Sequence, residues 1–195
     1  SCLASFPSMY YIVHMTYGKH LRTVRERLRK TDRSFSLRQV AMRVGIEPAY
    51  LSKIERGEVA PPSEATTRKL AAELGEMRER IRQEQAARRG EALAASPKHG
   101  PGGLVDIEFA TQLGVLASAR RYPRVIRATG TRDQLQELAA IGWLDDGAAQ
   151  HLRATMDCLR QQRLMAVLVG GSAADCPGLD EAARIVERKL QSGAG

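Results

Sequence analysis

A short predicted helix over residues 48–56 carries outward side chains that could bind DNA. Leu51 and Ile54 are spaced to face a core, which turns the rest of the helix toward solvent. An α-helix fits the major groove of B-form DNA, which is roughly 12 Å wide, and residues near its N-terminus reach the base edges. The side chains on this outward flank are Ala49, Tyr50, Ser52, Lys53 and Arg56.

The helix predicted between Ser36 and Gly45 adds two exposed cations, Arg38 and Arg43. In such a pair of helices the first crosses the DNA backbone, so both guanidinium groups are expected to contact phosphate. Residues 18–60 carry 11 Lys and Arg against 5 Asp and Glu, whereas residues 61–195 carry 19 against 17. This concentrated positive charge is typical of a surface that binds a polyanion.

A second string that could do chemistry covers residues 98–109, KHGPGGLVDIEF. Its glycine-rich loop enters a predicted helix whose first turn carries Asp106 and Glu108. Backbone N–H groups of such a loop could cradle a phosphate, and the two carboxylates could hold magnesium. Acidic residues in a first helical turn are more often caps favoured by the helix dipole, and the chemistry alone favours that interpretation.

The sequence predicts no catalytic residue, no metal site and no cofactor. The histidines have no metal-ligand spacing and form no Ser/Cys–His–acid grouping. Two-metal nucleotidyl transfer needs a Gly-Ser turn followed by an Asp-x-Asp pair on a strand, and the chain contains no Asp-x-Asp. Gly171, Ser172 and Asp175 imitate the beginning of that pattern, but no strand pattern surrounds them and we attribute the match to chance.

Composition excludes several other classes of protein. No apolar run approaches the ~18–20 residues that cross a bilayer, so no membrane partner is expected. Aromatic residues make up 5% of the chain, which argues against a protein that stacks single-stranded bases. Cys2, Cys158 and Cys176 have no Cys-x-x-Cys spacing. They predict neither a disulfide framework nor a zinc site, and a reducing cytoplasm is the expected compartment.

Local signals over residues 36–57 predict a helix-turn-helix. Ser36 and Gln39 form a capping box, in which each side chain can satisfy a backbone N–H at the start of a helix. Gly45 suits the left-handed turn that ends this helix, and Pro48 suits the first turn of the next. Two short helices joined by such a turn cross each other, which would present the second helix to a groove.

The chain as a whole is predicted to be all-α, with an N-terminal helix-turn-helix bundle followed by a C-terminal helical bundle. Gly75 is expected to end the fourth helix, and a capping box at Thr131 and Gln134 is expected to open a later one. The predicted parts are a disordered leader or mis-start over residues 1–15, a helix-turn-helix domain over 16–75, a helical domain over 76–168, and a flexible tail with a short helix over 169–195.

Four strings in the first third of the chain are distinctive together. They are residues 36–41 (SLRQVA), 44–46 (VGI), 50–57 (YLSKIERG) and the closing pattern of Pro, Thr, Leu and Gly over 62–75. Residues 18–75 thereby resemble the phage-repressor-like, xenobiotic-response-element (XRE) class of DNA-binding domains. The resemblance implies sequence-specific binding to double-stranded DNA by a transcriptional regulator, with a homodimer spanning two half-sites.

The resemblance also implies roles for individual side chains. Residues at base-reading positions are Ala49, Tyr50 and Lys53, and those expected at phosphate are Arg38, Arg43, Ser52 and Arg56. Glu55 matches an acidic residue that pairs with an arginine of the first helix, here Arg25, so this pair is structural. Leu37 departs from the Gln of many members, which shifts backbone anchoring toward Arg38 and main-chain N–H groups.

Residues 76–168 resemble the helical region at the C-terminal end of glutamine synthetase adenylyltransferase. Residues 98–112 match its string Lys-x-Gly-x-Gly-Gly-Leu-x-Asp-Ile-Glu-Phe-x-x-Gln at every fixed position. In that family the loop lies beside the nucleotidyl-transfer site, and its matching residues here are Lys98, Gly100, Gly102, Gly103, Asp106 and Glu108. The alternative function is therefore a non-catalytic fragment that binds glutamine synthetase or a separate catalytic domain.

The sequence resembles one family up to Gly75 and another family from Glu76, with no linker between them. This abrupt change could join two halves that function together, or it could result from an accidental join through a frame error or a gene fusion. The sequence leaves both explanations open.

Overall fold

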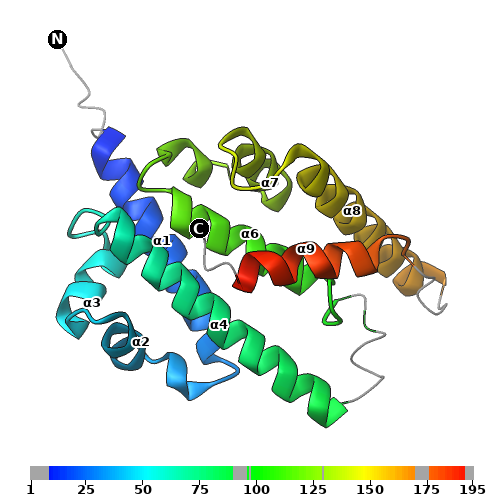
Figure 1. Ribbon diagram of the computed structural model, residues 1–195, viewed down its shortest axis with the longest axis horizontal. Helices are drawn as coiled ribbons and strands as arrows, with labels where there is room; N and C mark the ends of the chain where they lie inside the picture. The colour runs from blue at the N-terminus through cyan, green and yellow to red at the C-terminus, as the bar shows by residue number, and fades with distance from the viewer. Residues whose placement is uncertain (1–8, 90–95, 97, 129, 170–175, 192–195) are drawn as a thin grey trace.

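The computed structural model describes residues 9–89, 96, 98–128, 130–169 and 176–191. Within these ranges the chain forms helices and turns and no strand, which confirms the predicted all-α class (Figure 1). The elements in chain order are α1 (Met9–Arg29), η1 (Arg33–Phe35), α2 (Leu37–Val44), α3 (Pro48–Arg56), α4 (Glu64–Arg89), α6 (Leu104–Ser118), η2 (Pro123–Ile126), α7 (Thr131–Ala140), α8 (Asp146–Val169) and α9 (Leu179–Gln191).

The boundaries of α2 and α3 follow the local signals in the sequence. The Ser36 side chain accepts a hydrogen bond from the Gln39 N–H at 3.4 Å, so the serine half of the capping box forms. The Ser36 N–H donates instead to the Arg33 carbonyl at 3.1 Å, which leaves the reciprocal half unmade. Gly45 and Gly57 end the two helices with φ of 77° and 73°, in the left-handed region that favours glycine.

Helix α4 corrects the prediction that Gly75 ends a helix. It runs unbroken from Glu64 to Arg89 through the point where the sequence changes family. Glycine inside a helix costs only about 1 kcal/mol relative to alanine. Buried Leu74 and Met77 lie on either side of Gly75 and hold the helix against the core. The boundary expected between residues 75 and 76 therefore falls inside a single rod.

Helix α6 is the centre of the C-terminal half. It is buried along most of its length and packs against α1, α4, α7, α8 and α9. Because α1 belongs to the N-terminal bundle and α4 runs through both regions, the apolar side chains of both halves form one continuous core. An ion pair from each of these helices also reaches α6, namely Arg27–Glu108 at 3.0 Å and Arg78–Asp106 at 2.9 Å.

The two ends of the described chain are both helical. Helix α1 begins at Met9, inside the segment expected to be a disordered leader, and residues 1–8 lie outside the described ranges. At the other end, α9 corresponds to the short helix expected in the tail, and its Ile185, Val186 and Leu190 are buried against the core.

Two local predictions in the C-terminal half are wrong. Thr131 is already helical and makes no side-chain cap, because Gly130 is the N-cap and the Gln134 side-chain amide donates to the Ala128 carbonyl. Cys158 of α8 and Cys176, which precedes α9, form a disulfide that the absence of a Cys-x-x-Cys motif did not suggest. Only the antiparallel approach of α8 and α9 brings these two cysteines together.

No helix in the described ranges combines the length and the apolar character needed to cross a membrane.

Candidate nucleic-acid interface

The outward flank of α3 is open to solvent. Leu51 and Ile54 are buried at 0% and 1% exposure, whereas Ala49, Tyr50 and Lys53 on the opposite side are exposed, Tyr50 at 38%. Helix α3 packs on α1 and α2. Figure 1 shows it at the edge of the molecule, away from α7, α8 and α9. The C-terminal half therefore does not cover the surface that the sequence assigned to base contacts.

Close packing against α1 fixes the position of α3. A Cβ atom at Gly18 would lie 2.1 Å from the Ile54 carbonyl oxygen, so only glycine allows α1 to cross the end of α3 at this separation. Beside this crossing, Arg25 and Glu55 form a two-pronged ion pair at 2.6 and 2.8 Å, with both side chains 4% exposed. Arg25 also donates to the Phe35 carbonyl at 3.2 Å. These contacts orient the exposed flank as a rigid unit.

Two of the three arginines expected at phosphate are held by carboxylates of the same chain. Arg43 pairs with Glu73 of α4 at 2.6 Å. Arg56 pairs with Glu58 and donates to the Ser52 hydroxyl, and its guanidinium lowers the pKa of the Glu58 carboxyl below its usual range. Neither carboxylate was expected from the sequence to hold an arginine, although Glu58 lies only two residues beyond Arg56.

The other two cations on the surface formed by α2 and α3 are not paired with a carboxylate of the described part of the chain. Arg38 and Lys53 are exposed and make no ion pair with any residue that the structure describes. The surface formed by α2 and α3 thus presents two cations without an ion pair in the described ranges, Arg56 held by the exposed Glu58, Arg43 held by the largely buried Glu73, and one aromatic side chain. The exposed Arg56–Glu58 pair is weak enough for a competing phosphate to displace it.

A glycine of the loop over residues 98–103 allows close packing against α9. Gly102 has φ of 69°, and a Cβ atom there would lie 2.6 Å from the Leu179 carbonyl oxygen and 2.7 Å from the Ala183 nitrogen. The loop therefore needs glycine in order to pack against the start of α9. Gly100 and Gly103 are also buried, whereas Lys98 is exposed.

The two carboxylates of that string pair with arginines of α1 and α4. Asp106 is 3% exposed and pairs with Arg78, and the half-buried Glu108 pairs with Arg27. Burial raises the pKa of the Asp106 carboxyl, and the Arg78 charge opposes that rise. No group of three or more His, Cys, Asp or Glu side chains in the described ranges is placed to hold a metal ion.

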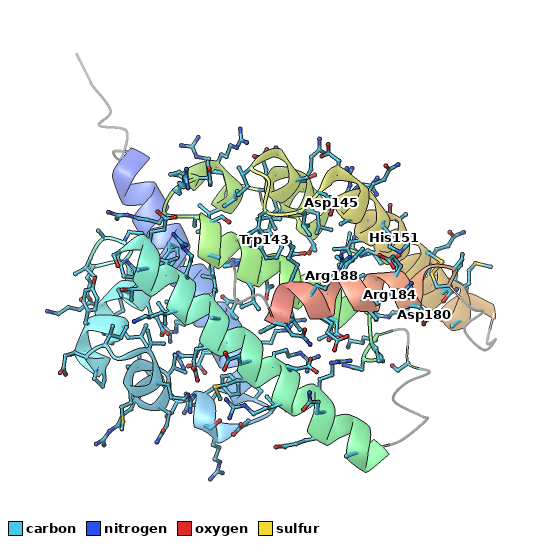
Figure 2. All side chains as sticks on the ribbon, in the orientation of Figure 1. Trp143, Asp145, His151, Asp180, Arg184 and Arg188 are labelled. Carbon is cyan, nitrogen blue, oxygen red and sulfur yellow. A yellow bond between two sulfur atoms is a disulfide. The ribbon has the colours of Figure 1, made fainter. Side chains whose placement is uncertain are left out.

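The chance match to a nucleotidyl-transfer motif cannot be placed, because Gly171, Ser172 and Asp175 lie outside the described residues. Other polar groups of the C-terminal half serve packing between helices. His151 contacts the Gly178 carbonyl at 2.8 Å, and Lys189 lies over the Trp143 ring at 4.9 Å. Figure 2 shows His151 beside α8 and Trp143 near the middle of the molecule, over α6.

Comparison with family models divides the chain into two overlapping regions. Residues 16–83 match a model described as a helix-turn-helix domain. Residues 75–175 match a model described as GlnD PII-uridylyltransferase. The two matches overlap over residues 75–83, which all lie inside α4.

Relatives of the C-terminal half carry the name bifunctional glutamine synthetase adenylyltransferase/adenylyl-removing enzyme. The protein of Methylococcus capsulatus is 39% identical over 90 residues, covering 46% of this chain and 9% of that protein. The protein of Burkholderia mallei is 37% identical over 100 residues, covering 47% and 10%. The chain thus spans about a tenth of the length of these relatives. No solved structure matches the chain.

Proposed function

The chain belongs to the GlnD PII-uridylyltransferase family, and because a helix-turn-helix domain precedes that region we propose that it binds double-stranded DNA sequence-specifically. The supporting observation is the exposed flank of α3, which is held in place by the buried Arg25–Glu55 pair. We place this activity in a transcriptional regulator, without catalysis by the chain itself.

In the proposed complex α3 enters the major groove. Lys53 and Tyr50 donate hydrogen bonds to base edges, and the small Ala49 side chain allows close approach or contacts a thymine methyl. Arg43, Ser52 and Arg56 exchange their present partners within the chain for phosphates of the DNA backbone. The exposed Arg38 also contacts a phosphate. Two copies related by a two-fold axis would place two α3 helices about one DNA turn apart, roughly 34 Å.

Substitution of the base-reading residues tests this proposal. Tyr50→Ala and Lys53→Ala should each weaken binding to a selected operator by ~1–3 kcal/mol, with less change on random duplex. Operator selection from a random library followed by fluorescence anisotropy at fixed salt measures both affinities. Lys98→Ala, an exposed lysine in the loop before α6, is the matched control. Equal affinities for all three variants and the parent protein would contradict the assignment.

Removing a competing carboxylate should strengthen binding. Glu58 holds Arg56 in an exposed pair, so Glu58→Gln frees that guanidinium and removes a negative charge near the DNA backbone. We expect about two- to fivefold tighter binding at low salt, with the gain shrinking as salt rises. The control is Glu84→Gln, an exposed position near the far end of α4. If both variants gain equally, overall charge and not the Arg56 pair sets the affinity.

A second candidate function follows from the names of the relatives, which act on glutamine synthetase. In it, the helical half binds glutamine synthetase or a nucleotidyltransferase domain supplied by another chain. The match over nearly half of this chain favours testing it. Purified glutamine synthetase should then co-sediment with the full chain, and Tyr50→Ala should not affect that association. DNA binding without this association would leave the first proposal standing alone.

A further inference from the structure

A second concentration of positive charge lies outside the helix-turn-helix. The segment that follows α6 carries four exposed arginines and no acidic residue between positions 119 and 132. We call these four residues the second basic patch, and they are Arg120, Arg121, Arg124 and Arg127.

Contacts join this patch to the N-terminal bundle. Arg120 donates to the Pro61 carbonyl at 3.0 Å, and Pro61 lies in the connection that leaves α3 for α4. Arg121 and Arg68 of α4 line one hollow of about 200 Å³. The short helix η2 inside the patch also packs against α1. Figure 1 shows this segment at the same end of the molecule as α3, with α1 and the beginning of α4 between them.

Acidic side chains offset only part of this charge. Glu64 pairs with Arg68 at 2.8 Å, and Glu137 pairs with Arg124 at 3.1 Å, and all four side chains are more than a third exposed. Arg121 instead stacks on the Tyr122 ring at 5.3 Å, a contact that leaves its N–H groups able to donate sideways. The surface therefore keeps an excess of cations beside the connection that follows α3.

We propose that the second basic patch contacts backbone phosphates of the same duplex whose major groove receives α3. This inference rests on the proposed function, and it gives the C-terminal half a direct part in DNA binding. Phosphate contacts carry no sequence information, but they fix register and add affinity. The patch is anchored through Arg120 to the α3–α4 connection, so a duplex seated on α3 would continue toward it.

Paired charge-removing variants test the inference on the full chain. Arg121→Gln with Arg127→Gln removes two charges from the patch, and Arg184→Gln with Arg188→Gln removes two from α9. Figure 2 shows Arg184 and Arg188 on α9, and their side chains are 67% and 69% exposed. Affinity for the selected operator and for random duplex is measured as a function of salt. Hydroxyl-radical footprinting locates the protected phosphates, and Trp143 fluorescence verifies folding.

Loss of two phosphate contacts should reduce the slope of log affinity against log salt concentration by about 1.8. It should also lower the affinity for the selected operator and for random duplex roughly tenfold. The footprint should shorten on one side, and Arg121→Lys with Arg127→Lys should restore the slope. A patch variant that matches the α9 variant in slope and footprint would overturn the inference while leaving the proposed function intact. A parent protein that binds no duplex would overturn the proposed function and this inference with it.

Discussion

Replacing Glu55 by alanine should lower the free energy of unfolding by about 3–5 kcal/mol, because it leaves the Arg25 guanidinium buried without its main counterion. Both side chains are 4% exposed, so water cannot replace the lost carboxylate. Glu26 remains 2.8 Å from Arg25, but it is 37% exposed and accepts only from Nη2, so the Nε that now donates to Glu55 would lose its partner. Urea denaturation followed by far-UV circular dichroism measures the loss.

A double substitution distinguishes a role of the Arg25–Glu55 pair in stability from a role in DNA binding. Arg25→Met with Glu55→Leu removes both charges and keeps apolar volume, so it should recover most of the stability lost in Glu55→Ala. If the pair is purely structural, the double variant should also bind the selected operator nearly as well as the parent chain. A loss below about 1 kcal/mol in Glu55→Ala would show that the pair is not buried as described.

The N-terminal bundle could be predicted closely because its signals are local. Ser36, Gly45 and Pro48 act through backbone atoms within four residues of themselves, and the structure places each at the helix boundary that the sequence indicated. The exposure of Lys53 followed from the same logic, since buried Leu51 and Ile54 leave it only the opposite side of the helix.

Long-range partners escaped prediction because sequence spacing does not encode them. Arg78 and Asp106 are 28 residues apart, and Arg27 and Glu108 are 81 apart, so only the packing of α1 and α4 on α6 reveals these pairs. The same packing explains why Gly75 does not end a helix. Its local conformational cost is small, and contacts from another part of the chain outweigh it.

Charge counting predicted a basic surface but not how much of it is already neutralised. Glu73 lies 30 residues beyond Arg43 and reaches it only because α4 crosses beside α2. Glu58 was close enough in sequence to be noticed, since an acid just past the end of a basic helix can fold back on it. Net charge over a segment therefore overestimates the number of cations available to a phosphate.

Breaking the Arg78–Asp106 pair should destabilise the whole chain, because this pair lies between α4 and α6 in the shared core. Arg78→Met leaves a 3% exposed carboxylate without its counterion, and we expect a loss of about 3–5 kcal/mol. Trp143, the single tryptophan, reports on the C-terminal half, and circular dichroism reports on all helices. Both signals should shift together to lower urea. Separate transitions would mean that the two halves unfold independently, as an accidental join would predict.

The pH dependence of the same variant gives an independent check. Burial already raises the pKa of Asp106, and removing the Arg78 charge removes the main opposition to that rise. The folded variant then holds a proton at pH values where the unfolded chain, with an Asp pKa of about 3.9, has lost it. Stability must fall as the pH rises through this interval, so Arg78→Met should be more stable at pH 5 than at pH 7. Arg78→Met with Asp106→Asn should lose this dependence. If the single variant is equally stable at both pH values, Asp106 does not sit in a buried environment between α4 and α6.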